Sequence, residues 1–253
     1  MSAVEQKHSA TGAAPTGAHD EKSAARAVQQ MFDEIAPRYD LLNHVLSMNV
    51  DRIWWWRTAR YFRHILQDPQ ARVLDLCCGT GDMGVALRKQ APPQAYPYFG
   101  ADFSHQMLRG GSDKFRARGI VAVEADALKL PFRDAKFALV VSAFGFRNLA
   151  NYRSGLAEIH RVLQPGGEVG ILDFSAPGGL LGKVYSIYFR RVLPKIGTLI
   201  SGVSGPYTYL PASVEKFPTP DAMLQHMRDI GFADASWTPY TFGIAGLYRA
   251  KKI

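Results

Sequence analysis

The feature that most constrains this chain is a ten-residue run, residues 73–82, with the sequence Val-Leu-Asp-Leu-Cys-Cys-Gly-Thr-Gly-Asp. An apolar strand pattern leads here into closely spaced glycines and then into a helical pattern. Gly79, Gly81 and Gly84 have the spacing of a dinucleotide-binding turn, and Asp102 follows at a distance where an acid can hold a ribose. The run predicts an α/β protein with a nucleotide-like ligand at the end of its first strand.

The remainder of the chain continues this alternation of strand and helix. We expect seven strands, at residues 73–77, 98–101, 120–124, 137–143, 168–173, 235–240 and 244–250. We expect helices from the glycine loop to residue 89 and at residues 104–117, 152–163 and 221–230, with Ser104 and Gly231 as caps and a Pro-Gly-Gly turn after the third. Strands separated by helices predict βαβ units and a mostly parallel sheet, here with an antiparallel edge formed by the last two strands.

Composition shifts divide the chain further. Residues 1–22 are rich in Ala, Gly, Ser, Thr and Pro, have no hydrophobic period, and are expected to form a disordered tail. Residues 23–253 are expected to form the α/β domain. Within it, residues 23–67 have a helical pattern that Pro37 interrupts, and Asp51 is expected to cap the last helix of that segment.

Composition also excludes several classes of protein. Apolar residues make up 47% of the 253 residues and charged residues 21%, as in ordinary globular proteins. The two cysteines, Cys77 and Cys78, are adjacent, which excludes a disulfide framework and a four-cysteine zinc site, and we expect no bound metal. No uncharged apolar run approaches the ~20 residues of a spanning helix, and the first residues lack a signal-peptide core. We therefore expect a soluble cytoplasmic protein.

The net charge of +8 predicts attraction to an anionic partner, although solubility alone would also explain it. Between Asp173 and Glu215 there is no acidic residue. The insertion at residues 176–206 combines apolar side chains with four basic ones, Lys183, Arg190, Arg191 and Lys195. Such an amphipathic stretch suits a lid over an apolar chain or contact with an anionic membrane, with a core-packed helical insertion as the alternative. The run Trp54-Trp55-Trp56 cannot occupy one helix face, so at least one of these rings is expected in the core.

Two nucleotide-like ligands fit the glycine loop, a dinucleotide and S-adenosylmethionine. Three features favour the methyl donor. Asp75 lies inside the first strand, where it can orient the loop and the ligand's ammonium group, and Asp126-Ala127 follows the third strand, where a carboxylate can accept from an adenine amino group. The Leu-Gln-Pro-Gly-Gly turn at residues 163–167 is typical of class I methyltransferases.

The chain from about residue 28 to 252 resembles the ubiquinone/menaquinone biosynthesis C-methyltransferases. The unspecific part of the resemblance is the glycine loop, which many methyltransferases share. The specific parts are Phe-Gly-Phe-Arg-Asn at residues 144–148 and Tyr-x-Tyr-Leu-Pro at 207–211; further markers lie at residues 32–47, 173–177 and 193–197. The sequence departs from the family pattern at Ala212, where Glu is common, and at Phe242, which interrupts a usual Thr-Gly-Gly-Ile.

This resemblance implies a class I S-adenosylmethionine-dependent methyltransferase, Rossmann-like, that methylates a ring carbon of a polyprenylated quinol. Residues 23–67 would then be a helical substrate cap. The double cysteine of the glycine loop, Cys77-Cys78, resembles the menaquinone-type members and favours demethylmenaquinol as the substrate. The ubiquinone-pathway benzoquinol is also open. The expected cofactor-binding residues, by motif match or from the loop itself, are Asp75, Gly79, Thr80, Gly81, Asp102, Asp126, Ala127 and Ser142.

A quinol becomes nucleophilic at carbon when a hydroxyl loses its proton and charge spreads to the ortho position. We expect Arg147 and Asn148, after the fourth strand, to stabilise that phenolate, as preorganised donors do. Tyr39 is the first candidate to position a proton-accepting water, with Asp102 or His44 behind it. A purely structural ion pair is the alternative for Arg147.

The sequence is also compatible with other functions. A basic methyltransferase could act on RNA or another small molecule, although no Asn-Pro-Pro-Tyr-type segment is present and neither cysteine is free of the cofactor loop. A non-catalytic protein of the same fold that binds lipid or a partner is a second alternative, and a nicotinamide oxidoreductase a weaker third. We expect a quinol substrate, peripheral contact with the inner face of an anionic membrane and no nucleic acid; the pattern permits a homodimer without requiring one.

Overall fold

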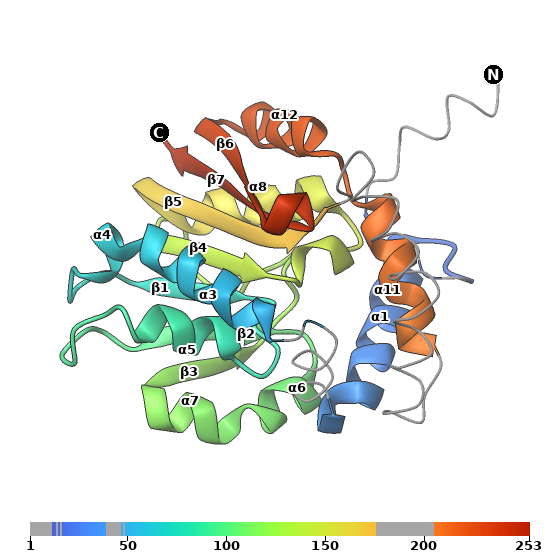
Figure 1. The fold of residues 1–253 in the computed structure, drawn as a ribbon, viewed down its shortest axis with the longest axis horizontal. Helices are drawn as coiled ribbons and strands as arrows, with labels where there is room; N and C mark the ends of the chain where they lie inside the picture. The colour runs from blue at the N-terminus through green and yellow to red at the C-terminus, as the bar shows by residue number, and fades with distance from the viewer. Residues whose placement is uncertain (1–11, 14, 16, 39–46, 48, 176–204) are drawn as a thin grey trace.

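The computed structural model describes residues 12, 13, 15, 17–38, 47, 49–175 and 205–253. One sheet of seven strands organises them, in the order β3-β2-β1-β4-β5-β7-β6 (Figure 1). The strands are β1 (Val73–Leu76), β2 (Tyr98–Asp102), β3 (Ile120–Glu124), β4 (Phe137–Ala143), β5 (Leu163–Phe174), β6 (Phe232–Tyr240) and β7 (Ala245–Lys252). β1 to β5 pair in parallel, and β7 is antiparallel to both β5 and β6. The predicted α/β fold with an antiparallel edge is confirmed.

Helices cover both faces of this sheet because alternate strand residues point to opposite sides. The helices are α1 (Glu21–Ile35), α3 (Val50–Tyr61), α4 (Arg63–Leu66), α5 (Asp82–Arg88), α6 (His105–Gly110), α7 (Ser112–Arg118), α8 (Tyr152–Val162), α11 (Gly205–Lys216) and α12 (Pro220–Ile230). Short 3₁₀ turns are η2 (Ala36–Arg38), η3 (Phe146–Asn148) and η5 (Thr241–Gly243).

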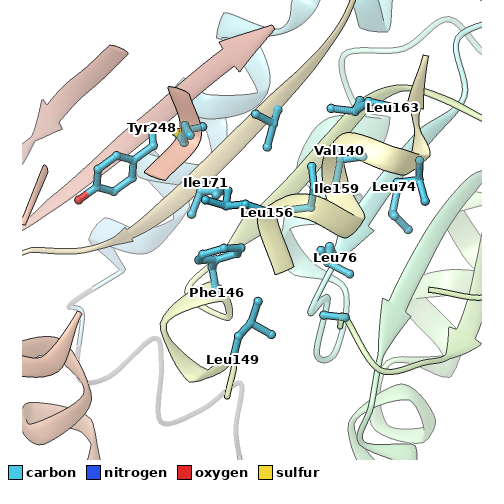
Figure 2. Packing of buried hydrophobic residues seen from close by; sticks show 14 of the residues in the cluster. Leu74, Leu76, Val140, Phe146, Leu149, Leu156, Ile159, Leu163, Ile171 and Tyr248 are labelled. Carbon is cyan, nitrogen blue, oxygen red and sulfur yellow. The ribbon is translucent and has the colours of Figure 1, made fainter. Parts of the chain in front are cut away.

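Each face has its own apolar core. Leu156 and Ile159 of α8 lie against Val140 and Ile171 of β4 and β5, and α12 extends this cluster (Figure 2). On the other face, α3, α5 and α7 bury Trp54, Trp55, Phe62, Met83, Leu87 and Phe115 against the opposite side of the same strands. The sheet is therefore enclosed, and its polar groups are left to gather at the strand ends.

α1 and α11 lie side by side at the carboxyl ends of the parallel strands (Figure 1). α1 begins with a capping box between Asp20 and Ser23, two residues inside the segment predicted as a tail. Earlier in that segment Ala13 is buried, and its N–H donates to the Leu149 carbonyl at 2.7 Å. Residues 1–11 of the predicted tail, and residues 176–204 of the predicted insertion, lie outside the described residues.

Three local predictions are wrong in detail. The expected helix at 104–117 is broken at Gly111, where a Cβ would lie 2.6 Å from the Thr80 carbonyl oxygen, so the close approach of the glycine loop divides it into α6 and α7. The Pro-Gly-Gly segment is a bulge within β5 and not a separate turn, since Leu163 already pairs with Phe137. Asn49, in the left-handed region, is the N-cap of α3, and Asp51 is a buried residue of its first turn.

Candidate active site

A cleft opens at the carboxyl ends of β1, β2 and β4, with about 700 Å³ of space that is partly open to solvent. Its floor comes from these strands and the loops that follow them. Ala25 and Phe32 of α1 form a wall of the cleft. α1 is held there by Gln29, whose side-chain amide donates to the Phe103 carbonyl at 2.7 Å, and by Asp33, which accepts from the Ser104 hydroxyl.

The glycine loop between β1 and α5 follows a path that side chains would block. Gly81 has φ +90°, and a Cβ there would lie 2.2 Å from a ring carbon of Phe115. Gly79, also in the left-handed region, lines the cleft and donates its N–H to Asp102 Oδ2 at 2.8 Å. Thr80 is buried behind the lining, where Lys114 Nζ lies 3.5 Å from its hydroxyl. The loop thus brings Gly79, with no side chain, and Cys77 to the cleft, while Thr80 and Gly81 lie outside the lining.

Asp102, the last residue of β2, presents a buried carboxylate to the cleft. Its two oxygens accept the N–H groups of Gly79, at 2.8 Å, and Ser104, at 2.9 Å. Burial raises the pKa of this carboxyl to about 6, against the lowering effect of those hydrogen bonds. Each oxygen retains a lone pair, so the carboxylate can still accept from ligand hydroxyls.

Asp75, inside β1, is buried directly beneath the loop. Its Oδ2 accepts the Gly84 N–H at 2.7 Å, and its Oδ1 has no hydrogen-bond partner among the described residues. Burial and then the neighbouring charge of Asp102 raise the pKa of the Asp75 carboxyl to about 8. Two buried carboxyls therefore lie at this end of the cleft with no described cation paired to either.

The other expected cofactor residues lie along the same edge of the sheet. Asp126 and Ala127, after β3, line the cleft, and Asp126 Oδ1 accepts the Leu128 N–H at 2.9 Å. Ser142, near the end of β4, is buried behind the lining, with a hydroxyl that has no well-formed hydrogen bond to a described residue. Of the predicted cofactor set, Gly79, Asp102, Asp126 and Ala127 line the cleft, while Asp75, Thr80, Gly81 and Ser142 support it from behind.

Arg147 lies in η3 and is buried, with its guanidinium turned to the end of β5. Nη1 donates to Asp173 Oδ1 at 2.9 Å and also to the Phe144 carbonyl, Nε lies 3.3 Å from the Ser213 hydroxyl, and the backbone N–H donates to Asp173 Oδ2 at 3.0 Å. The guanidinium also lies over the Phe174 ring, 5.2 Å from its centroid. Arg147 is thus in a buried ion pair and does not itself line the cleft.

Asn148 follows Arg147 and does line the cleft. Its Oδ1 accepts the hydroxyl of Tyr209 at 3.2 Å, so the amide Nδ2 remains available as a donor. Tyr209 and Ser213 are one turn apart on α11 and reach Asn148 and Arg147 respectively. α11 therefore holds the Arg-Asn segment from the side opposite to the sheet.

Asp173, Ser213 and Tyr209 lie in segments that the resemblance marked, but they were not predicted as site residues. The α1 contacts of Gln29 and Asp33 were not predicted at all. An acid that ends an apolar strand pattern was the available signal for Asp173. Tyr39 and His44, expected near the proton-transfer step, lie outside the described residues, as does most of the amphipathic insertion.

The site fits a ligand that carries hydroxyls and a positive charge. Asp102 can accept from ribose hydroxyls, and the unpartnered Oδ1 of Asp75 and the raised pKa of both carboxyls would be relieved by a cation. Within the described part of the chain, no cluster of three or more His, Cys, Asp or Glu is placed to hold a metal ion. The described helices include none that is both long and apolar enough to cross a membrane.

Comparison with known proteins finds relatives that are named as methyltransferases of quinone biosynthesis. The demethylmenaquinone methyltransferase of Deinococcus radiodurans is 48% identical over 236 residues, which covers 92% of this chain and 95% of that protein. The ubiquinone/menaquinone biosynthesis C-methyltransferase UbiE of Geobacter sulfurreducens is 42% identical and covers 89% of this chain and 88% of that protein.

Among solved structures, a SAM-dependent methyltransferase from Thermotoga maritima shares the fold, with a TM-score of 0.59, 17% identity, and coverage of 89% of this chain and 100% of that one. The model of the ubiE/COQ5 methyltransferase family matches residues 17–252. The chain belongs to the ubiE/COQ5 methyltransferase family.

Proposed function

We propose that this protein transfers a methyl group from S-adenosylmethionine to a ring carbon of a polyprenylated quinol. Demethylmenaquinol is the favoured substrate, because the relative with 48% identity is named for it, and the ubiquinone-pathway benzoquinol is the second. The observation that carries the proposal is one cleft that is lined by both the Asp102 carboxylate and the Asn148 amide, with the buried Asp75 carboxyl behind the lining.

In the cofactor half, Asp102 would accept the ribose hydroxyls and Asp126 with Ala127 would border the adenine. Asp75, fixed by Gly84, would orient the loop and attract the ligand's ammonium group. When bound, the cofactor supplies a methyl group on a positively charged sulfur, which needs alignment more than activation. These residues therefore do their work by positioning and by excluding water from the floor of the cleft.

In the substrate half, Asn148 would donate Nδ2 to the quinol oxygen as it loses its proton. Arg147 would add positive charge beside it: Nη1 is bound to Asp173, whereas Nη2 donates to no described residue. A preorganised donor of this kind contributes about 3 kcal/mol to a transition state. Tyr39 remains the proposed residue for positioning the water that takes the proton.

The thiols of Cys77 and Cys78 are unsuited to the main alternative reaction, methylation of a pyrimidine ring carbon in a nucleic acid. Enzymes that methylate a pyrimidine ring carbon need a cysteine thiolate as nucleophile. Here burial raises the pKa of both Cys77 and Cys78 well above the usual value of a thiol, so both stay protonated. This supports a quinol over a nucleic-acid base as the carbon that is methylated.

A substrate with a long prenyl chain resides in a bilayer, so we propose a cytoplasmic protein in peripheral contact with an anionic membrane. The net charge of +8 supports such a contact. The insertion expected to make it lies outside the described residues. A homodimer stays a prediction that nothing in the sheet or the cleft requires.

The test is a product assay by mass spectrometry. Purified protein is incubated with methyl-labelled S-adenosylmethionine and reduced demethylmenaquinone or reduced benzoquinone substrate, with the oxidised quinones as controls. Label on the ring carbon with reduced substrate alone is the expected result, and the faster of the two identifies the preferred ring. Cofactor binding without label on either quinol would transfer the substrate assignment to RNA or another small molecule, or the protein to a non-catalytic role.

A further inference from the structure

The outer face of α3 is the most unusual exposed surface among the described residues. Ile53, Trp56 and Arg60 follow one another at helical spacing on that face, and Ile53 and Trp56 are 55% and 48% exposed. The adjacent Trp54 and Trp55 are buried in the core beneath, so the tryptophan run is divided between core and surface. An isoleucine and a tryptophan this exposed on one helix face need an explanation that core packing does not supply.

Arginines surround these apolar side chains and have no acidic partners among the described residues. Arg52, Arg57, Arg60 and Arg63 are all exposed, and none forms an ion pair with a described residue. Two are held over aromatic rings: Arg57 lies 4.3 Å from the centroid of Tyr240, and Arg60 5.2 Å from that of Trp56. The only acid of α3 is Asp51, which is buried. The face is therefore cationic, with guanidinium groups positioned in advance.

η5 adds a protruding apolar side chain next to α3. The Trp54 indole N–H donates to the Thr241 hydroxyl at 2.8 Å, which joins the two elements. Phe242 is 82% exposed and has φ +58° and ψ +23°, a left-handed conformation that favours glycine. The phenyl ring of Phe242 is thus held in solvent by a backbone conformation that is strained for a non-glycine residue.

The buried side of α3 contacts the lining of the cleft. Trp54 packs against Phe144, which lines the cleft, with ring centroids 5.7 Å apart. The Ser175 hydroxyl donates to the Gly243 carbonyl at 2.7 Å, so η5 also touches the end of β5, from which residues 176–204 continue. A partner on the outer face of α3 would therefore be separated from the cleft lining by α3 alone.

We propose that the outer face of α3 together with Phe242, named here the α3–η5 face, docks on an anionic lipid bilayer, with the arginines at the headgroup phosphates and Phe242, Ile53 and Trp56 in the interfacial layer. The proposal rests on the proposed function only for its biological purpose, the delivery of a prenylated quinol. Exposed Ile and Phe side chains favour a bilayer over a nucleic acid, because they gain by entering apolar surroundings and form no contact with phosphate.

Vesicle flotation tests the charge component. We expect wild-type protein to bind vesicles of phosphatidylglycerol and phosphatidylcholine, and to bind pure phosphatidylcholine weakly. Each basic side chain near an anionic surface changes partitioning about fivefold, so Arg57→Gln/Arg60→Gln should lower it about 30-fold. The matched control, Arg116→Gln/Arg118→Gln, removes the same charge from α7, which packs on β3 at the other edge of the sheet. Equal loss in both pairs, or no loss in the first, would overturn the α3–η5 assignment.

Phe242→Gly tests the apolar component without risk to folding, because glycine suits the backbone at this position. We expect partitioning to fall about tenfold while the thermal midpoint is unchanged or higher. Phe242→Trp, with brominated lipids, should show tryptophan quenching by chains bromine-labelled near the headgroup. Absence of additional quenching relative to wild type would contradict insertion.

Two controls separate this proposal from the proposed function. Methyl transfer to a water-soluble quinol lacking the prenyl chain should be the same in wild type and in all these variants. If wild type methylates no quinol but the variants still lose vesicle binding, the membrane surface stands and the substrate assignment fails. If Arg57→Gln/Arg60→Gln instead weakens binding to an RNA oligonucleotide and leaves vesicle binding intact, the face is a nucleic-acid surface and the lipid proposal is wrong.

Discussion

Asp102 and Asp173 are both buried carboxylates at the carboxyl ends of two parallel strands of one sheet, yet they are partnered in opposite ways. Asp173, at the end of β5, has an internal cation, since Arg147 Nη1 lies 2.9 Å from its Oδ1. Within the described part of the chain, Asp102 at the end of β2 accepts hydrogen bonds from backbone N–H groups alone, and so does Asp75 beneath it. The charge of Asp173 is compensated inside the protein, so this pair supports the fold. The charges of Asp102 and Asp75 are not compensated by a described cation, so a positively charged ligand would be stabilised there.

The largest expected effect concerns the ion pair between Arg147 and Asp173. Arg147→Met leaves the Asp173 carboxylate buried without a cation and should lower the free energy of unfolding by about 3–5 kcal/mol. Adding Asp173→Asn removes that charge but keeps an acceptor for the neighbouring N–H groups, so the double variant should regain about 2 kcal/mol. Urea unfolding measures both. A single variant within about 1 kcal/mol of wild type would show that the pair is not an electrostatic unit.

The same double variant separates stability from catalysis. Because it should fold, its turnover reports what Arg147 does for the reaction. We expect methyl transfer to fall about 100-fold, in line with the loss of a preorganised donor, while cofactor affinity is unchanged. Full turnover in the folded double variant would reduce Arg147 to a structural residue.

The next largest effect concerns Asp102, the buried carboxylate without a described cation beside it. Asp102→Asn keeps the shape of the side chain but loses the charge that strengthens hydrogen bonds to ligand hydroxyls. We expect S-adenosylmethionine to bind about 2 kcal/mol more weakly, about 30-fold in Kd, by calorimetry. Asp113→Asn, on the exposed side of α7, is the matched control and should bind like wild type. Equal affinities for Asp102→Asn and wild type would place the ribose elsewhere.

A smaller effect is the pH dependence of the ligand-free protein. Burial raises the pKa of Asp102 to about 6, above the unfolded value of about 3.9, so the native state binds the extra proton and stability falls as pH rises between these values. Relative to wild type, Asp102→Asn should therefore gain about 1 kcal/mol per pH unit from pH 4 to pH 6 and change little above. Unfolding free energies over this range measure it, and a constant difference would mean that the carboxyl is not desolvated.

The smallest effect tests how α11 supports the substrate half. Tyr209→Phe removes the hydroxyl that fixes Asn148, at a cost of about 1 kcal/mol, so kcat should fall about fivefold. Cofactor affinity and thermal midpoint should be unchanged, which separates positioning from a structural defect. The control is Tyr98→Phe, since the buried Tyr98 hydroxyl has no partner among the described residues. A loss of kcat in both variants alike would contradict the positioning role.

The two halves also differ in how far the sequence predicts them. The cofactor half is built from one continuous segment, so the strand pattern, the glycines and Asp75 are legible in order along the chain. Gly79, Asp102, Asp126, Ala127 and Asn148 line the cleft, and their roles toward cofactor and substrate stay predictions. The break between α6 and α7 at Gly111 was not predicted, because it depends on Thr80, which is near in space and distant in sequence.

The substrate half depends on contacts between distant residues. Arg147 and Asp173 are 26 positions apart, and Asn148 and Tyr209 are 61 apart, so no local pattern reports that they meet. The resemblance to a family marked these segments as specific but did not predict that the guanidinium turns to β5. That orientation follows from the burial of Asp173, whose charge requires a partner inside the protein.

The most direct test of the contrast between these carboxylates is proton release on cofactor binding. Burial raises the pKa of Asp75 to about 8, so its carboxyl is mostly protonated at pH 7 in the ligand-free protein, and a bound cation would favour its ionised form. Calorimetric titration with S-adenosylmethionine at pH 7, in two buffers of different ionisation enthalpy, should show release of about one proton per site by wild type and none by Asp75→Asn. Binding with no proton release by wild type would contradict the account, because the Asp75 carboxyl would then not change its ionisation when the cation binds.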